Sequence, residues 1–397
     1  MAPVETARPL HILVLADRDW AHHDTGGNGA NLYAQISRWV AWGHRVTMVA
    51  GDYPGAEKVE RFGPRLTVYR MGDRVTVFPR AFLAVRRGIG RDADVVLEVI
   101  NGITFLTPLW LRKPRVAMVH HVHRELFLGE YPRTGLLLYW ILERLPLLLY
   151  RRTPFLTISR SARDELVRDG IPRENVTVEY LGVDPEKFRR GTRSEEPRLI
   201  FVGRLKAYKR VEALLDVLEA IPEATLDVVG EGDHRPDLEA EIARRGLGPR
   251  VCMHGYVDDD TKAELYGRAW VNVTASQSEG WSLTVMEAAM CGTPSAALAV
   301  GGLTESIVDG ETGLLAHDTD GLCGGVRRII ESPALRERLG DAAERRARNF
   351  TWDRSAAVYL EVLQRTAGMQ MPSMDGSGNG SDPAAAGDPG RVSRTRG

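Results

Sequence analysis

The chain has 397 residues, of which 43% are apolar and 26% are charged, and its formal net charge is −1. This length is too great for one hydrophobic core and suits two domains, while the near-zero charge argues against a nucleic-acid-binding protein. Its three cysteines, Cys252, Cys291 and Cys323, form no CxxC pair, so neither a disulfide framework nor a zinc site is expected. We expect no signal peptide and no transmembrane helix, and hence a cytoplasmic protein.

The first predicted unit is a strand over residues 11–16, a helix ending at Gly43, and a strand over residues 45–50. The Gly26-Gly27-Asn28-Gly29 loop precedes the helix, where a backbone can approach a phosphate or a sugar. The loop does not match the dinucleotide pattern GxGxxG, and a simple tight turn is the alternative interpretation.

Residues 78–91 form a basic amphipathic segment, for which we predict a helix. One side carries arginines and the other is apolar, with Arg80, Arg86, Arg87 and Arg91 against Phe78, Phe82, Leu83 and Val85. Such a helix can lie on an anionic membrane surface. The alternative is a helix packed on the core with a solvated arginine face.

Three histidines, His120, His121 and His123, follow a predicted strand over residues 116–119. Ligands of open α/β sheets bind at the carboxyl ends of strands, so these side chains are candidates for ligand contact. Of carboxylates and cysteines, only Glu125 lies nearby, which argues against a metal site. A long helix is predicted over residues 136–152.

The second half of the chain repeats the alternation of strands and helices after a charged stretch, Arg189 to Pro197, which we interpret as a linker. Its first strand, LIFV, is followed by Gly203, Arg204 and Lys209. The alternation predicts a second doubly wound sheet.

The most informative stretch is EGWSLTVMEAAMCGTP, in which Glu279 and Glu287 stand eight positions apart. The apolar run around Glu287 predicts a helix that ends at Cys291-Gly292. A carboxylate in such surroundings needs donors, and vicinal sugar hydroxyls supply them in pairs. The alternative is one structural glutamate at the helix start and one surface glutamate.

Together with GRL…K at Gly203 and GG…ES…DG…GLL from Gly301, this Glu-seven-Glu motif resembles the retaining GT-B glycosyltransferases of family 4. The resemblance implies an α/β fold of two Rossmann-like doubly wound domains facing a cleft, with a C-terminal helix crossing back to the first. The implied organisation is an acceptor-binding domain (1–190), a linker (191–197), a nucleotide-sugar donor-binding domain (198–350), the crossing helix (about 352–367) and a disordered tail (368–397).

The resemblance also implies the reaction. A hexose-type sugar would move, with retention, from a UDP- or GDP-linked donor to a hydroxyl of a lipid-linked, polysaccharide or other glycan acceptor. Arg204 and Lys209 would stabilise the leaving phosphate in place of a metal, and no cofactor is expected. Glu287 would bind the ribose, Glu279 the transferred sugar, and His120, or His121 in a register shifted by one, would reach that sugar. The protein would work in the cytoplasm or at the inner face of the plasma membrane, in contact with anionic lipid.

The residues carried over fall into three groups. The catalytic ones are His120, Arg204, Lys209 and Glu279; the further donor-binding ones are Gly26, Gly27, Gly203, Glu231, Tyr256, Val257, Gly280, Trp281, Ser282, Leu283 and Glu287; and the acceptor-side candidates are His121, His123 and Glu125. Trp281 stands where the family more often has Phe, and a larger indole would narrow the sugar pocket. The alternatives are a transferase for a small-molecule acceptor, a nucleotide-sugar epimerase, or a non-catalytic nucleotide-sugar-binding protein. The oligomeric state is not predicted.

Overall fold

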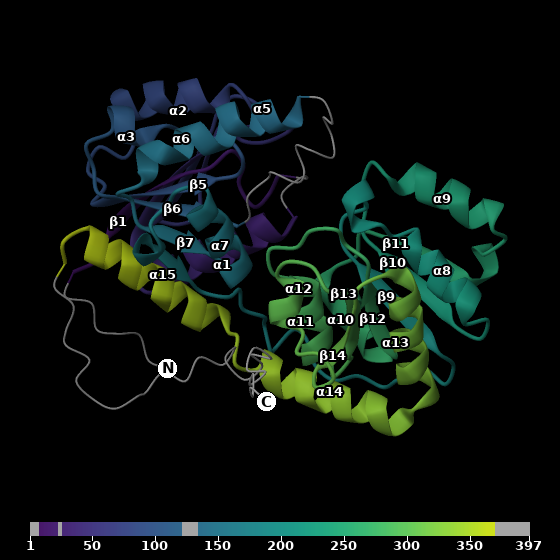
Figure 1. The fold of residues 1–397 in the computed structure, drawn as a ribbon. Helices are drawn as coiled ribbons and strands as arrows, with labels where there is room; N and C mark the ends of the chain where they lie inside the picture. The colour runs from purple at the N-terminus through teal and green to yellow at the C-terminus, as the bar shows by residue number, and fades with distance from the viewer. Residues whose placement is uncertain (1–7, 23–25, 121–133, 370–397) are drawn as a thin grey trace, which may run out of the picture. The chain divides into compact units, whose positions relative to one another are not determined.

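The computed structural model describes residues 8–22, 26–120 and 134–369, and the chain folds into two compact units (Figure 1). Unit 1 runs to Asp184 and includes Ser278–Leu283 and the described residues from Phe350 to Met369. Unit 2 comprises Pro185–Gln277 and Thr284–Asn349. His121, His123 and Glu125 and residues 370–397 of the predicted tail lie outside the described residues.

Unit 1 is built on an eight-stranded sheet with the order β3-β4-β2-β1-β5-β6-β7-β8. Its strands are β1 (His11–Leu15), β2 (Arg45–Ala50), β3 (Val59–Arg61), β4 (Leu66–Arg70), β5 (Val95–Ile100), β6 (Arg115–Val119), β7 (Phe155–Thr157) and β8 (Val176–Val178). Only the β3–β4 pair is antiparallel among the described strands. Alternate residues of β1 enter two different apolar clusters, so the sheet is covered on both faces.

The helices of unit 1 include the last one of the described chain. They are α1 (Gly26–Ala41), α2 (Val77–Arg86), α3 (Thr107–Trp110), α5 (Gly135–Tyr139), α6 (Leu145–Leu147), α7 (Arg160–Arg168) and α15 (Trp352–Thr366), with shorter turns η1 (Trp140–Arg144), η2 (Leu148–Tyr150) and η3 (Arg173–Asn175). The Trp39 indole of α1 donates to the Ala356 carbonyl of α15 at 3.0 Å. The predicted return of the C-terminal helix to the first domain is confirmed.

Unit 2 is built on a six-stranded parallel sheet with the order β11-β10-β9-β12-β13-β14. The strands are β9 (Arg198–Val202), β10 (Thr225–Val229), β11 (Val251–Gly255), β12 (Val271–Thr274), β13 (Ser295–Leu298) and β14 (Gly313–Ala316). The helices are α8 (Ala213–Ala220), α9 (Arg235–Arg244), α10 (Asp259–Arg268), α11 (Leu283–Met290), α12 (Leu303–Ser306), α13 (Thr319–Glu331) and α14 (Pro333–Ala347), with short turns η4 (Ala207–Lys209) and η5 (Gly248–Arg250). The prediction of two doubly wound α/β domains is confirmed.

Several predicted boundaries differ from the structure. Helix α1 already begins at Gly26, so the glycines form its first turn rather than a loop before it. Helix α2 ends at Arg86 instead of continuing to residue 91, because Gly88 and Gly90 have left-handed φ angles of 115° and 65°. The helix predicted over 136–152 changes pitch in a π-helical turn, η1, just before Pro146. A proline there cannot donate to the carbonyl four residues earlier.

The stretch interpreted as a linker packs on unit 2. The Arg193 guanidinium donates to the Thr293 hydroxyl at 2.9 Å and also contacts the carbonyls of Ala269 and Gly292. Burial, with Arg190 and Arg336 nearby, lowers the pKa of Arg193 to about 10. Residues 191–197 therefore form part of unit 2, and the chain enters that unit at Pro185.

Among the parallel strands of each sheet, the order reverses at one place, which in open α/β sheets marks the ligand-binding crevice. The reversal lies between β1 and β5 in unit 1 and between β9 and β12 in unit 2. The loops after these four strands therefore hold the positions to examine for function.

Candidate active site

In unit 2, three loops meet closely at the carboxyl ends of β9, β10 and β11. A Cβ atom on Gly230 would lie 2.0 Å from the Gly203 carbonyl oxygen, and one on Gly232 would lie 2.0 Å from that of Leu205. The Gly230 amide also donates to the Gly255 carbonyl at 2.7 Å. Only glycine permits this approach, which brings the backbone around Arg204, Glu231 and Tyr256 to one edge of the sheet.

The two predicted cations follow β9 on a single loop. Arg204 is exposed, and the half-buried Lys209 ammonium lies 5.1 Å from the centre of the Tyr208 ring. The Tyr208 carbonyl accepts a hydrogen bond of 2.8 Å from the Gln277 amide, in the loop that follows β12. This hydrogen bond links the loop after β9 to the loop after β12, across the point where the strand order reverses. Two cations at this point of the sheet suit an anionic ligand.

The predicted nucleobase contacts lie beside that loop. The Glu231 carboxylate pairs with Arg235 one helical turn later, so it already has a cationic partner. Tyr256 is 86% exposed and follows Gly255, whose φ is 70°, while Val257 is half-buried. A phenol ring held open at a strand end offers a stacking surface for a planar base.

Glu287 lies on α11, and its carboxylate is only 14% exposed. It accepts hydrogen bonds from the Lys262 ammonium at 3.2 Å and from the Tyr266 hydroxyl at 3.1 Å, both on α10. Burial raises the pKa of Glu287, and Lys262 and Tyr266 work against that rise. The two donors fix the carboxylate in one position and leave lone pairs that can accept ligand hydroxyls.

Lys262 and Tyr266 were missed by sequence reasoning. Burial works to lower the pKa of Lys262, but the Glu287 and Asp259 carboxylates outweigh it and hold this pKa above its ordinary value. Their spacing of four residues on a helix places both side chains on one face, which was the available signal. The sequence does not predict that this face of α10 packs against Glu287 of α11.

In unit 1, His120 ends β6 and is 2% exposed. The Asn31 amide nitrogen of α1 donates to its Nε2 at 2.8 Å. The Gln35 amide nitrogen donates in turn to the Asn31 oxygen and to the Ser355 hydroxyl of α15, each at 2.9 Å. Because Nε2 accepts, the neutral ring carries its proton on Nδ1. This buried chain orients the imidazole, and the sequence analysis did not identify Asn31 or Gln35.

Glu279 belongs to the same unit, and its neighbour Gly280 packs against His120. A Cβ atom on Gly280 would be 2.8 Å from the His120 carbonyl oxygen and 3.2 Å from the Ile158 side chain. Position 280 therefore requires glycine, and the half-buried Glu279 is one residue from this contact. The structure thus brings the backbone next to Glu279 against the backbone of His120.

Trp281 is 4% exposed and packs in an aromatic cluster. Its ring centre lies 4.4 Å from that of Tyr180 and 5.2 Å from that of Phe350. The adjacent Ser282 is also buried. The indole therefore anchors the Ser278–Leu283 stretch to unit 1. That it narrows a sugar pocket stays a prediction.

The glycines at the start of α1 lie in the same unit. Gly26 has a φ of 53°, and a Cβ on Gly27 would be 3.7 Å from the Leu283 side chain. The first amides of a helix have no acceptor within it, so this end of α1 can donate to an anion or a hydroxyl.

One group of described residues, Asp227, Cys252 and His254, has ligand-type atoms within 4.8 Å of one another. The Asp227 carboxylate already accepts two hydrogen bonds from Arg198, at 3.0 and 3.1 Å, and one of 2.7 Å from His254 Nε2. This network satisfies the carboxylate with protein donors. Metal independence of the reaction remains a prediction.

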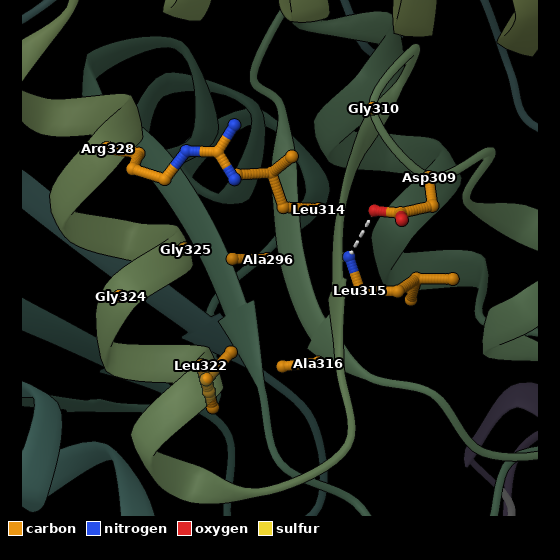
Figure 2. Close-up of a pocket in the computed structure, with 11 residues that line it drawn as sticks. Ala296, Asp309, Gly310, Leu314, Leu315, Ala316, Leu322, Gly324, Gly325 and Arg328 are labelled. Carbon is orange, nitrogen blue, oxygen red and sulfur yellow. Dashed lines mark hydrogen bonds between the residues drawn. The ribbon is translucent and has the colours of Figure 1, made fainter.

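A cavity of about 430 Å³ lies between α13 and the strands β13 and β14 (Figure 2). Its wall on α13 is formed by Gly321, Gly324 and Gly325, which have no side chains to fill it, and by Leu322 and Arg328. None of the predicted site residues lines this cavity. It reflects the small residues of α13.

Comparisons with known proteins agree with this architecture. A family model described as Glycosyltransferase Family 4 matches residues 25–187, and one described as Glycosyl transferases group 1 matches residues 183–346. D-inositol 3-phosphate glycosyltransferase of Xylanimonas cellulosilytica is 34% identical over 228 residues, covering 51% of this chain and 55% of that relative. The chain spans about half the length of the curated relatives it matches.

Two solved structures share the fold. Sucrose-phosphate synthase from Thermosynechococcus elongatus has a TM-score of 0.75 and 21% identity, covering 90% of this chain and 98% of that one. Anabaena HepE, solved in complex with UDP and glucose, has a TM-score of 0.72 and 19% identity, covering 89% and 98%. Since the two adjoining family models together span residues 25–346, the chain belongs to the GT-B glycosyltransferases of family 4 and group 1.

Proposed function

We propose that this protein is a retaining, metal-independent glycosyltransferase that moves a hexose from a nucleotide diphosphate sugar to an acceptor hydroxyl. The observation that carries the proposal is that unit 2 holds both a cationic loop and a fixed carboxylate. Arg204 and Lys209 follow β9 where the strand order reverses, and Glu287 is held by Lys262 and Tyr266. Cations suit the diphosphate and the carboxylate suits the ribose hydroxyls.

The reaction breaks the bond between the anomeric carbon and the β-phosphate oxygen, which gains negative charge. The Arg204 guanidinium and the Lys209 ammonium stabilise that charge, the task that a metal performs in other transferases. The acceptor oxygen bonds to the anomeric carbon on the same face, and its proton passes to the departing phosphate. This route keeps the configuration and needs no dedicated protein nucleophile.

The sugar contacts come from unit 1. The Glu279 carboxylate accepts hydrogen bonds from hydroxyls of the transferred hexose. It also stabilises the positive charge that develops at the anomeric carbon of this sugar. His120, with its proton on Nδ1, donates to a sugar hydroxyl. The tautomer set by Asn31 supports this role.

For the donor, UDP-sugars are the first to test and GDP-sugars the second, because a protein of the same fold, Anabaena HepE, was solved with UDP and glucose. For the acceptor, we propose a lipid-linked or polysaccharide glycan. A small phosphorylated polyol is the second candidate, favoured by the 34% identity to D-inositol 3-phosphate glycosyltransferases.

The test begins with thermal unfolding in the presence of UDP, GDP, ADP or dTDP, each with and without EDTA. A ligand that binds only the folded state raises the melting temperature, and we expect one diphosphate to do so equally in EDTA. Arg204→Ala and Lys209→Ala should lose that shift. Lys206→Ala is the matched control, because Lys206 lies on the same loop but pairs with Asp233 at 2.7 Å.

Transfer is then measured with sugars on the nucleotide that binds, and the anomeric configuration of the product is read by NMR. Glu279→Ala should abolish turnover while the diphosphate shift persists. Full turnover in Glu279→Ala and Lys209→Ala, or an inverted product, would contradict the proposal.

A further inference from the structure

Residues 135–150 form a helical segment made of α5, η1, α6 and η2. Unlike an ordinary surface helix, this segment exposes apolar side chains and buries a charged one. Its buried positions include Glu143, at 1% exposure, together with Tyr139, Leu147 and Tyr150. Among the side chains of this segment that the structure describes, the exposed ones are large and apolar, with exposures from 37% to 61%: Leu136, Leu137, Trp140, Ile141, Leu142, Leu145, Leu148 and Leu149. A monomeric soluble protein rarely presents so continuous an apolar face to water.

Buried hydrogen bonds hold the segment in this orientation. The Tyr150 hydroxyl donates to the Glu98 carboxylate of β5 at 2.6 Å and accepts from the Thr107 amide of α3 at 3.1 Å. The Tyr139 hydroxyl donates to the Asp169 carboxylate. Rotating the segment to hide its leucines would break these bonds inside the protein, so the apolar face is built into the fold.

The apolar face continues onto α2 and α3, which lie with α5 and α6 on one side of unit 1 (Figure 1). The Phe82 ring of α2 packs edge-on against Trp110 of α3, with 5.2 Å between ring centres. Leu83 and Leu109 are 47% and 65% exposed. We call the exposed faces of α2, α3 and residues 135–150 the apolar surface.

The exposed charged side chains on the elements of the apolar surface have one sign. Arg80, Arg86 and Arg87 are exposed on and just after α2, and Arg151 and Arg152 directly follow the segment. Within 74–91, 107–113 and 134–152 the single acidic residue is the buried Glu143. The Arg144 guanidinium stacks on the exposed Trp140 ring at 4.3 Å. This combination complements an apolar layer with anionic headgroups.

We propose that the apolar surface docks in the plane of an anionic lipid bilayer, with residues 135–150 entering the boundary between headgroups and acyl chains. The segment is about 24 Å long, shorter than the roughly 30 Å hydrocarbon layer, so it lies in the interface and does not span it. No helix of the described ranges has the length and apolarity to cross a bilayer. A second copy of the chain fits less well, because a two-fold contact would bring the arginines together.

The docking does not depend on the donor chemistry. Its consequence for the reaction rests on the proposed function: the acceptor would be a glycan or hydroxyl carried by the same membrane. Sequence analysis placed membrane contact on residues 78–91 alone. In the structure the larger apolar contribution comes from residues 135–150.

The test is co-sedimentation of the full chain with vesicles of phosphatidylcholine alone or mixed with phosphatidylglycerol. We expect binding to the mixed vesicles, weak binding to pure phosphatidylcholine, and loss of binding in high salt. The triple variant Leu137→Ser/Trp140→Ser/Leu145→Ser, and separately Arg151→Glu/Arg152→Glu, should each lower the partition coefficient about tenfold or more. The matched control is Val59→Ser/Arg61→Glu on β3, an exposed apolar and basic pair outside the apolar surface.

The melting temperature and the shift with the binding nucleotide are measured for every variant, so that a misfolded protein or a failed donor site is separated from failed docking. Wild-type protein that is folded and binds nucleotide but ignores anionic vesicles would overturn the proposal. So would a triple variant that binds vesicles like wild type. A wild-type dimer in sedimentation that the triple variant turns into a monomer, without vesicle binding, would assign the surface to a second copy.

Discussion

Asn31 determines which nitrogen of His120 carries the proton, so it is a positioning residue. We expect Asn31→Leu to lower kcat about 10- to 100-fold, with a smaller effect on the KM of the donor, and to shift the acidic limb of the pH profile. Ser37→Ala, on the same helix, is the control, because its hydroxyl bonds only the Ala34 carbonyl. An unchanged pH profile in Asn31→Leu would contradict the role.

The Lys262 ammonium favours the charged form of the buried Glu287 carboxylate and so opposes the rise in pKa that burial causes. Lys262→Met keeps the length of the side chain and removes its charge, which leaves a buried carboxylate that favours its protonated form. We expect the Kd of the donor nucleotide to rise about 10-fold or more, corresponding to about 1–3 kcal/mol, and Tyr266→Phe to have a smaller effect. Calorimetric binding of the nucleotide measures both.

Lys187→Met is the control for this pair, because it removes a nearby lysine whose ammonium donates to Asp259 at 2.8 Å. Nucleotide binding by Lys262→Met that matches the control would show that Glu287 does not need this partner.

Two buried histidines make stability depend on pH. Burial lowers the pKa of His11 and of His44, and Arg45 lowers that of His11 further. The unfolded chain therefore binds more protons than the native state below a pH of about 6.5, and the free energy of unfolding falls as the pH drops through this value.

Urea unfolding at about pH 7.5 and about pH 5.5 should show lower stability at the acidic pH. The difference should be smaller in His44→Gln, although this variant also loses the 2.9 Å hydrogen bond from the Leu10 amide. A stability that rises on acidification would contradict the assignment.

At the scale of elements, two glycines of unit 2 should respond in opposite ways to the same substitution. Gly324, inside α13, has open space around the position of a Cβ atom. We expect Gly324→Ala to stabilise by about 0.5–1 kcal/mol, because alanine lowers the entropy of the unfolded chain.

Gly230→Ala should instead destabilise by more than that, since its φ is 131° and its Cβ would meet the Gly203 carbonyl. Denaturant midpoints of the two variants provide the comparison. A stabilised Gly230→Ala would mean that the close contact of the β9 and β10 loops is not needed.

The elements themselves were largely predictable, and the exceptions have local causes. Continuous apolar runs identified the buried strands. Helical spacing identified α1, and an apolar run that ends at Cys291-Gly292 identified α11. The ends of helices were less predictable: left-handed glycines stop α2 early, and Pro146 interrupts the regular helix after α5. Where a helix ends depends on which backbone carbonyl loses its hydrogen-bond donor. The spacing of apolar residues does not predict that position.

At the scale of the whole molecule, the candidate site was predictable where a motif carried it. Glu279, Glu287, Arg204 and Lys209 could be named from spacing and from resemblance, although their roles remain proposals. Lys262 and Asn31 could not, because their importance arises from contacts between elements distant in sequence. The apolar surface was likewise hidden, since composition does not say which side of a helix faces water.

The division of the chain has a consequence for cutting the protein into parts. Between residues 8 and 369, as far as the structure describes them, the chain passes between the units after Asp184, Gln277, Leu283 and Asn349. A gene fragment that stops at Asp184 would therefore lack α15 and Trp281 and would expose the Trp39 and Tyr180 faces that they cover. We expect the fragment 1–184 to be insoluble when it is expressed alone. Its solubility should be restored when the remaining fragment is co-expressed and supplies α15 and Trp281.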